Sequence, residues 1–166
     1  MYGMTNTCKK CESPLESHTE RTPACTVCVR YKALVSNANH ARRGGASPGV
    51  SITLREFAAW FATQPRICSF CSIPEALVPH LDLRTQVGLP LQRLGIDRKA
   101  CDAGYELDSI HLCCFACNKA RSNTFGLTEM FAIGRSIAGV WTERLAKKGI
   151  VWSAADAGTG GRDELV

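Results

Sequence analysis

The sequence predicts a small α+β zinc-binding protein with two four-cysteine sites and a long C-terminal helix. Three observations lead to this fold class: 10 cysteines in 166 residues, their arrangement in four C-x-x-C pairs, and apolar residues at helical spacing near the C-terminus. The chain is 45% hydrophobic and 21% charged, which is typical of a folded protein rather than a disordered one. It contains no apolar run of the ~18 residues that cross a bilayer and no apolar signal region at its start, so we expect neither a membrane protein nor a secreted one.

A zinc ribbon is expected at 1–30, because two C-x-x-C pairs lie there with 13 residues between them. Two residues between thiols allow one tight turn to direct both sulfurs at a single tetrahedral ion. In a reducing compartment these cysteines are not expected to form disulfides, and ordinary buried cysteines rarely show this spacing. The expected zinc ligands of the ribbon are Cys8, Cys11, Cys25 and Cys28.

Basic connecting helices are expected at 31–65. Residues 29–43 are basic and compatible with a helix, and the Gly, Ser and Pro residues at 44–49 indicate a turn or linker. Thr53 is expected to cap a second helix at 54–64, which the following proline ends.

A second four-cysteine site is expected in the main domain at 66–150. Its two C-x-x-C pairs are separated by 42 residues, so the ion would join segments that are distant in the sequence. The expected ligands are Cys68, Cys71, Cys114 and Cys117. The two remaining thiols are expected to be core residues or bystanders: Cys101 and Cys113.

Between these pairs we expect an irregular segment at 72–90, a short strand at 92–97, a return strand at 107–113 and a helix that begins at Cys114. A hairpin that packs on a helix in this order could bring Asp97 and Asn118 near one another.

A longer helix is expected at 129–148, capped by Thr128, and the tail at 151–166 is expected to be disordered. The apolar stripe of this helix favours core packing, with a partner-binding groove as the alternative. The stripe consists of Met130, Ile133, Ile137, Val140, Trp141 and Leu145.

Asp97 and Asn118 are the candidate ligands of a second kind of metal. Asp97 ends the first predicted strand, and Asn118 is expected to open the helix directly after the last knuckle cysteine. Carboxylate and amide oxygens are hard ligands that suit Mg²⁺. The alternative is that Asp97 is a turn residue and Asn118 is a helix cap.

Four segments together resemble the HNH, or His-Me finger, nucleases, and most closely the phage HNH and endonuclease VII-like group. They are CSFC at 68–71, RLGIDR at 93–98, GYELDSI at 104–110 and CCFACNKARS at 113–122. The resemblance implies a ββα-metal fold that hydrolyses DNA phosphodiester bonds with one Mg²⁺ or Mn²⁺. It implies that Asp97 and Asn118 hold this catalytic ion, while the second four-cysteine set holds a structural zinc. With the ribbon, we expect two structural Zn²⁺ ions.

The chain departs from this family at Arg98, where most members have the histidine that acts as general base. A guanidinium stays protonated, so Arg98 can contact the scissile phosphate but cannot accept a proton. The middle asparagine of the family falls at Ser109. His111 on the second strand is the candidate replacement base, with a core or surface histidine as the alternative. Tyr105 is a second candidate for proton transfer, although a tyrosine beside a turn glycine usually packs.

Two basic pairs are candidate phosphate contacts, with solvated surface charge as the alternative. Lys119 and Arg121 lie beside the expected metal site, and Arg42 and Arg43 follow the basic helix. With eight thiolates and two zinc ions, the formal charge of +5 falls to about +1, so net basicity alone says little about nucleic acid.

The resulting hypothesis is a metal-dependent DNA endonuclease of the HNH class, encoded by a phage or mobile element and acting in the cytoplasm on duplex or branched DNA. A homodimer is a possible arrangement, because one active site cuts one strand. The first alternative is an inactive HNH scaffold that binds nucleic acid, and the second is a zinc-stabilised interaction protein.

Overall fold

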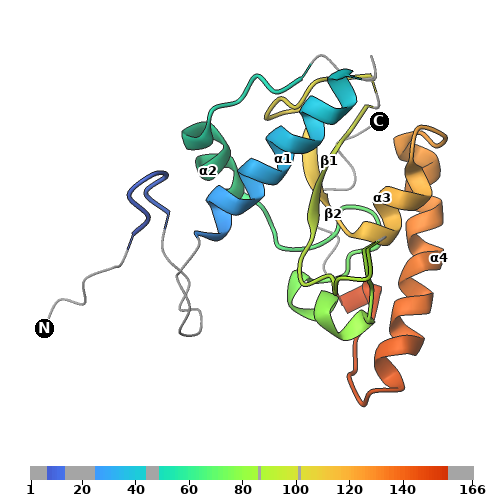
Figure 1. The fold of residues 1–166 in the computed structure, drawn as a ribbon. Coiled ribbons are helices and arrows are strands. Elements are labelled where there is room, and N and C mark those ends of the chain that lie inside the picture. The colour runs from blue at the N-terminus through green and yellow to red at the C-terminus, as the bar shows by residue number, and fades with distance from the viewer. Residues whose placement is uncertain (1–6, 14–24, 44–48, 86, 101, 157–166) are drawn as a thin grey trace, which may run out of the picture. The chain divides into compact units, whose positions relative to one another are not determined.

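Figure 1 shows the computed structural model of the chain, which describes residues 7–13, 25–43, 49–85, 87–100 and 102–156. The chain forms two compact units. One contains Met1–Pro65 and Arg98–Ile110, and the other contains Arg66–Asp97 and His111–Val166. The predicted α+β class is confirmed: two four-cysteine sets accompany a two-stranded sheet and a long C-terminal helix. None of the described helices combines the length and the apolar character that crossing a membrane requires.

The first unit contains α1 (Thr26–Arg43) and α2 (Leu54–Thr63). Thr53 caps α2 as predicted. Its hydroxyl accepts a hydrogen bond from the Glu56 N–H at 3.3 Å, and the Glu56 carboxylate accepts one from the Thr53 N–H at 2.7 Å. This reciprocal pair satisfies backbone donors that the first helical turn leaves unpaired.

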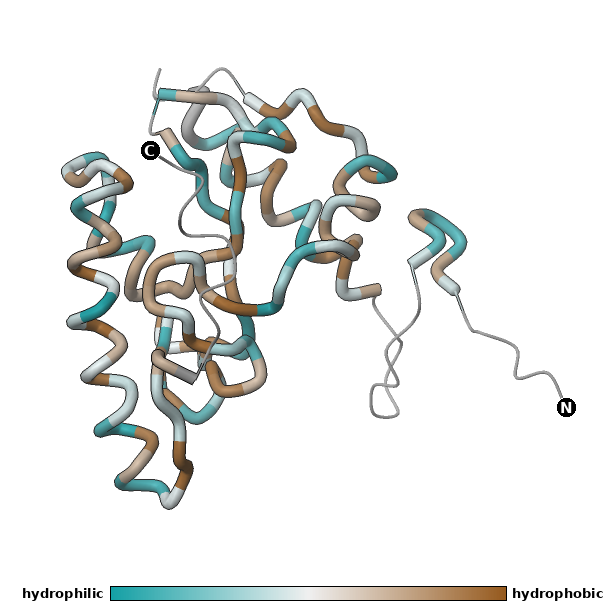
Figure 2. Tube along the Cα trace, turned by 180° about the vertical axis from the view of Figure 1, so that it is seen from behind, coloured by the Kyte–Doolittle hydropathy of each residue, from teal (hydrophilic) through white to brown (hydrophobic). Residues whose placement is uncertain are grey.

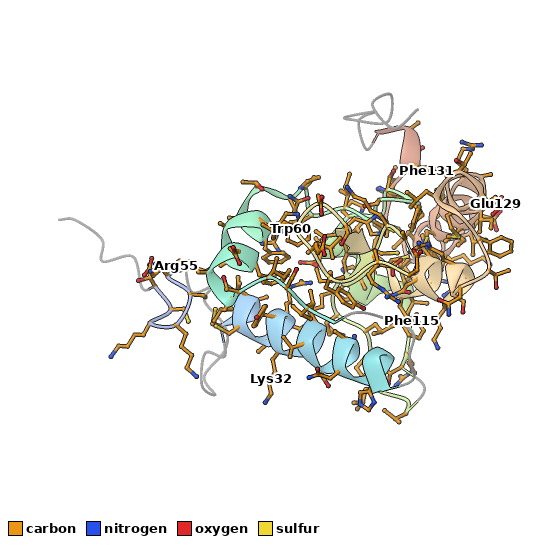
Figure 3. All side chains as sticks on the ribbon, turned by 90° about the horizontal axis from the view of Figure 1, so that it is seen from above. Lys32, Arg55, Trp60, Phe115, Glu129 and Phe131 are labelled. Carbon is orange, nitrogen blue, oxygen red and sulfur yellow. The ribbon has the colours of Figure 1, made fainter. Side chains whose placement is uncertain are left out.

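Aromatic rings form the core between α1 and α2. Phe57 and Phe61 stack with ring centroids 5.7 Å apart, and Tyr31 from α1 lies 5.7 Å from Phe57. The Tyr31 hydroxyl donates to the Ile52 carbonyl at 2.8 Å, so its polar end is satisfied. Lys32 points away from α2 on the outer side of α1 (Figure 3).

The second unit is built around a hairpin and two helices. β1 (Gly95–Arg98) pairs with β2 (Ile110–Cys113), and α3 (Phe115–Arg121) follows directly. The segment expected to be irregular contains a 3₁₀ helix, η1 (Glu75–Leu81). A short 3₁₀ helix accommodates the internal proline of this segment more easily than a longer α-helix does.

The C-terminal helix α4 (Leu127–Ala146) begins two residues earlier than predicted. Gly126, rather than Thr128, is its N-cap, and the Glu129 carboxylate accepts a hydrogen bond from the Gly126 N–H at 2.9 Å. The far end of α4 is tied to η1, because the Arg144 guanidinium donates to the Leu81 carbonyl at 2.9 Å. The chain then forms a short 3₁₀ turn, η2 (Ala154–Asp156), and the rest of the predicted disordered tail lies outside the described residues.

The buried side of α4 differs in part from the predicted stripe. Val140 is 49% exposed and the two isoleucines are half-buried, so these positions lie at the edge of the interface. The buried positions are Met130, Gly134, Ala138, Trp141 and Leu145. Hydrophobic and hydrophilic positions alternate along α4 in Figure 2, as expected for a helix with one side in the core.

Replacing Gly134 by alanine is expected to destabilise the protein. A Cβ at this position would lie 2.4 Å from the Phe70 carbonyl oxygen, and backbone cannot yield as a flexible side chain can. Overpacking of this kind costs about 1–3 kcal/mol in the free energy of unfolding. The measurement is the urea unfolding midpoint of Gly134→Ala.

Gly139→Ala is the matched control on the same helix, because a Cβ there meets nothing within 4 Å. It is expected to stabilise the helix by up to about 1 kcal/mol. Equal midpoints for the two variants would contradict the close approach of α4 to Phe70.

Candidate active site and metal centres

The first four-cysteine set lies where the N-terminal turn meets the start of α1. Its four sulfurs lie within 4.8 Å of one another, and the Sγ atoms of Cys8 and Cys28 are 3.6 Å apart. A tetrahedral ion with Zn–S bonds of ~2.3 Å separates its sulfurs by about 3.8 Å, close to this value. The backbone N–H groups of Lys10 and Cys11 lower the pKa of the Cys8 thiol to about 6, which favours the thiolate that binds metal.

The second set joins the turn after residue 67 to the start of α3. All four of its cysteines are buried, and the Sγ atoms of Cys71 and Cys114 are 3.7 Å apart. The Cys114 N–H points at the Cys68 sulfur at 3.3 Å, and the Cys117 N–H points at the Cys114 sulfur at 3.4 Å. Such donors stabilise thiolates in a site without water.

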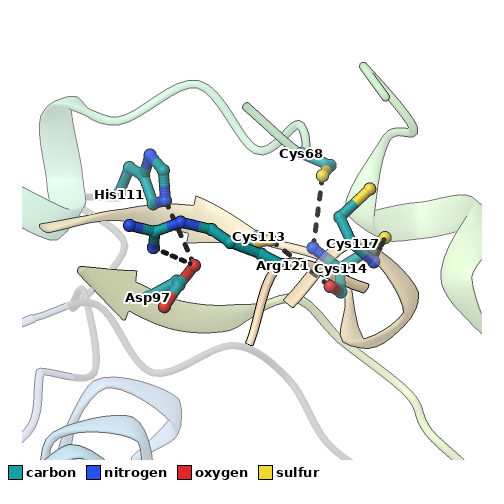
Figure 4. A network of polar contacts seen from close by, with 7 residues as sticks. All are labelled: Cys68, Asp97, His111, Cys113, Cys114, Cys117 and Arg121. Carbon is teal, nitrogen blue, oxygen red and sulfur yellow. Dashed lines mark hydrogen bonds and ion pairs between the residues drawn. The ribbon is translucent and has the colours of Figure 1, made fainter. Parts of the chain in front are cut away.

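Both sets fit structural zinc, as predicted. Cys113 lies outside the second set, although it is fully buried beside it, and its thiol contacts the Cys114 carbonyl at 3.4 Å. Figure 4 shows three cysteines of this set, Cys68, Cys114 and Cys117, together with the polar cluster that Asp97, His111 and Arg121 form.

That cluster is centred on the Asp97 carboxylate. Arg121 Nη1 lies 2.9 Å from Asp97 Oδ2, and His111 Nε2 lies 3.6 Å from the same oxygen. The Arg121 and His111 side chains are only 3% and 11% exposed, so water screens their interactions with Asp97 only weakly. The His111 and Phe70 rings form a T-shaped contact, with centroids 5.0 Å apart and planes at 89°, which restricts the orientation of the imidazole.

The Asp97 carboxylate is ionised in this cluster. Burial raises the pKa of Asp97, but the neighbouring His111 and the ion pair with Arg121 lower it and prevail, so the pKa lies below its ordinary value. A buried carboxylate that stays charged is suited to hold a divalent cation.

Asn118 lies inside α3 and not at its start, which corrects the prediction. Cys114 is the N-cap, and the Asn118 N–H donates to the Cys114 carbonyl at 3.0 Å. Asn118 precedes Arg121 by three residues, which is about one turn of α3. Asn118 also lines an open pocket of about 270 Å³ with Phe115, Lys119 and Ser122.

Arg98 lies at the end of β1 and is held within the loop that leads to β2. Its Nη1 donates to the Ala103 carbonyl at 2.8 Å, and its guanidinium lies 5.4 Å from the centre of the Tyr105 ring. The Ser109 hydroxyl donates to the Gly104 carbonyl at 2.8 Å, so it organises the same loop. Tyr105 is therefore a packing partner of Arg98 in the first unit.

The predicted basic contacts fall in three different environments. Lys119 is exposed, and its ammonium lies 5.8 Å from the centre of the Phe115 ring. Arg121 is buried and bonded to Asp97, so its contact with a phosphate stays a prediction that this placement does not favour. Arg42 and Arg43 end α1, and their side chains lie outside the described residues.

The chain is similar to a protein of known structure. It superposes on the rare-cutting HNH restriction endonuclease PacI, solved in a study of its DNA perturbation, with a TM-score of 0.70 and 29% sequence identity. The match covers 87% of this chain and 99% of PacI. The chain has the fold of an HNH nuclease. β1, β2 and α3 have the strand, strand and helix order of an HNH finger, and both four-cysteine sets fit the zinc sites of zinc-containing HNH proteins. No family model matches the sequence, and no curated protein matches it either.

Proposed function

We propose that this protein is a metal-dependent DNA endonuclease that hydrolyses phosphodiester bonds. The observation that carries the proposal is the ionised Asp97 carboxylate on the hairpin, 13% exposed and bonded to Arg121 of α3, the helix that begins at the second cysteine set and also contains Asn118. The similarity to PacI, a restriction endonuclease, supports the same activity. An origin in a phage or mobile element stays part of the proposal.

In this proposal Asp97 and Asn118 hold Mg²⁺ or Mn²⁺ through oxygen atoms. The ion would supply Lewis-acid stabilisation of the phosphate and lower the pKa of a bound water. Arg98 has no basic form near neutral pH, so its role is to stabilise negative charge on the phosphate. Lys119 is exposed and lies in the second turn of α3. In this proposal it contacts the DNA backbone.

His111 takes the proton from the attacking water. It lies on the strand opposite Asp97, its ring is held by Phe70, and it is the histidine that the described cluster contains. Neutral imidazole is the side chain best suited to accept a proton near pH 7. The Phe70 edge contact restricts the ring to one orientation, which favours a fixed proton path.

The test is conversion of supercoiled plasmid to nicked or linear forms with Mg²⁺ or Mn²⁺. Asp97→Asn keeps the size of the side chain but removes the charge that holds the ion. Loss of several kcal/mol of transition-state stabilisation predicts a decrease in rate of about a thousandfold. Asp82→Asn is the matched control, because it makes the same change at an exposed carboxylate of the same unit and is expected to cut normally.

Each variant is first checked for bound zinc and helical content, so that loss of fold is not mistaken for loss of chemistry. Cleavage by Asp97→Asn at the wild-type rate in a pure preparation would refute the proposed role of this residue. Double-strand cutting would in addition require two active sites or two successive events, and a homodimer is the proposed means.

A nucleic-acid-binding protein without nuclease activity is the second candidate. Two observations favour it: Asp97 is already neutralised by Arg121, and Arg98 occupies the position of the family's base. This reading predicts that wild type and Asp97→Asn both shift DNA in a salt-dependent manner and that neither cuts it.

A further inference from the structure

One side of α1 in the first unit is exposed and carries polar or small side chains. We define this polar face of α1 by five exposed residues: Lys32, Ala33, Ser36, Asn37 and His40. Lys32, Ser36 and His40 follow one another at intervals of four residues, so they lie on the same side of the helix, and Asn37 lies beside Ser36. Leu34 and Ala38, which are 2% and 0% exposed, occupy the buried side.

Contacts within the first unit fix the orientation of the polar face. The Tyr31 hydroxyl donates to the Ile52 carbonyl at 2.8 Å, and the buried Arg30 guanidinium lies 4.8 Å from the centre of the Phe61 ring. The first turn of α1 also carries Cys28, a member of the first four-cysteine set. A face that is already held in place loses little conformational entropy when it binds a ligand.

The segment that contains α1 is basic. Residues 21–55, from the position after Glu20 to the position before Glu56, contain no acidic residue and form the longest acid-free stretch of the sequence. The six Lys and Arg residues of this stretch are Arg21, Arg30, Lys32, Arg42, Arg43 and Arg55.

The described carboxylates of the first unit lie on elements other than α1. Glu12 forms an ion pair with Arg55 at 2.7 Å, and Glu56 caps α2. The other three belong to the segment between β1 and β2: Asp102, Glu106 and Asp108. Within the described part of the chain, the side chains of Lys32, Asn37 and His40 make no hydrogen bond or ion pair, so their polar groups are available to a ligand.

The composition of the polar face suits the major groove of duplex DNA, which is about 12 Å wide and admits an α-helix. Ala33 and Ser36 have short side chains, so the helix backbone can approach the base edges. The Asn37 amide can donate to N7 of adenine and accept from its N6 amino group. A protein partner would find no large apolar side chain on this face, whereas protein interfaces are centred on such side chains.

We propose that α1 lies in the major groove of duplex DNA, where Asn37 reads an adenine and Lys32 contacts a phosphate. The proposal rests on the proposed function, since that function makes DNA the substrate, and it adds residues that determine sequence preference. Lys32 projects from the outer side of α1 (Figure 3). It lies five residues before Asn37, or about 7.5 Å along the helix axis, so one helix can contact the backbone and the base edges together.

The experiment measures base preference and salt dependence separately, in the non-cutting Asp97→Asn background. The protein selects duplexes from a pool with random positions, and sequencing of the bound duplexes gives the base preference. Affinity for the preferred duplex is then measured at several salt concentrations. Base contacts determine the preference, whereas each phosphate contact adds about 0.9 to the slope of log K against log salt.

Asn37→Ala is expected to lose about tenfold discrimination in favour of adenine at one position of the site that each chain binds, with an unchanged salt slope. Asn37→Gln is expected to restore the preference, because the glutamine amide forms the same pair of hydrogen bonds. Lys32→Met is expected to lower the salt slope by about 1 and to keep the base preference. Gln92→Ala and Lys147→Met, at exposed positions of the second unit, are the matched controls and are expected to change neither.

An Asn37→Ala protein that selects the same sequences as its parent would overturn the role of Asn37, and an unchanged slope for Lys32→Met would overturn the phosphate contact. A parent protein that binds every sequence equally would overturn the readout by α1, while plasmid cleavage by wild type would still support the proposed function. A wild-type protein that neither binds nor cuts DNA would overturn the proposed function itself. If Lys32→Met converts a dimer to a monomer in sedimentation and binds DNA as before, the polar face contacts a second copy of the chain and the groove proposal fails.

Discussion

Cys68→Ser is expected to remove one of two zinc ions per chain and to unfold the unit that carries Asp97. The ion would join the turn at 68–71 to the start of α3, and all four of its cysteines are buried. Structural zinc contributes ~10–16 kcal/mol of apparent binding free energy, which is as large as the whole stability of a small domain. The measurements are zinc content by elemental analysis and helical content by circular dichroism.

Cys113→Ser is the matched control for this variant. Cys113 is equally buried and adjacent in sequence to a ligand, but it lies outside the four-sulfur set. It is expected to keep two zinc ions per chain. A wild-type protein with fewer than two zinc ions, or a Cys68→Ser protein that retains both, would contradict the assignment of the second site.

The zinc sites could be predicted because the two cysteines of each C-x-x-C pair lie within four residues of the sequence. A C-x-x-C turn places two thiols at one point whatever surrounds it, so spacing alone identified the eight ligands that the structure brings together. Thr53 was predictable for the same reason, since a cap and its Glu56 partner lie within one turn of helix.

The partner of Asp97 was not predictable from local pattern. Arg121 lies 24 residues away and looks like one of several basic residues on a short helix, so the sequence favoured contact with DNA. The burial of Arg121 depends on how α3 packs against β1, and the spacing of residues in the sequence does not predict that packing. The only signal was its position one turn after Asn118, on the face expected to meet the metal.

The buried side of α4 also depended on tertiary packing. Size and hydropathy favoured Val140, but the structure buries Gly134 and Ala138, because the helix backbone approaches the knuckle at Phe70 too closely for larger residues. Periodicity identifies a helix and its approximate face, whereas the closeness of approach is set by the partner.

Arg121→Met is expected to lower the free energy of unfolding by about 3–5 kcal/mol, although Arg121 is not one of the zinc ligands. The substitution keeps most of the volume but leaves the buried Asp97 carboxylate without its 2.9 Å partner. Arg135→Met on the exposed side of α4 is the control and is expected to change stability by less than about 0.5 kcal/mol. The measurement is the urea unfolding midpoint at constant slope.

A double-mutant cycle with Asp97→Asn isolates the ion pair. If the two side chains stabilise each other, the double variant will lose less stability than the sum of the single variants, with a coupling energy of about 1–3 kcal/mol. Additive losses would show that Arg121 is held by its surroundings and not by Asp97.

The same two variants connect stability with metal binding. His111 and Arg121 together keep the pKa of Asp97 below its ordinary value, but the positive charge of Arg121 opposes a divalent cation at the same carboxylate. Mn²⁺ is therefore expected to raise the unfolding midpoint of Arg121→Met more than that of wild type, because binding to the folded state alone stabilises it in proportion to affinity. It is expected to raise the midpoint of Asp97→Asn least. If Mn²⁺ moves none of the three midpoints, Asp97 is not a metal ligand, and Arg121 is its permanent partner in a scaffold that binds DNA without cutting it.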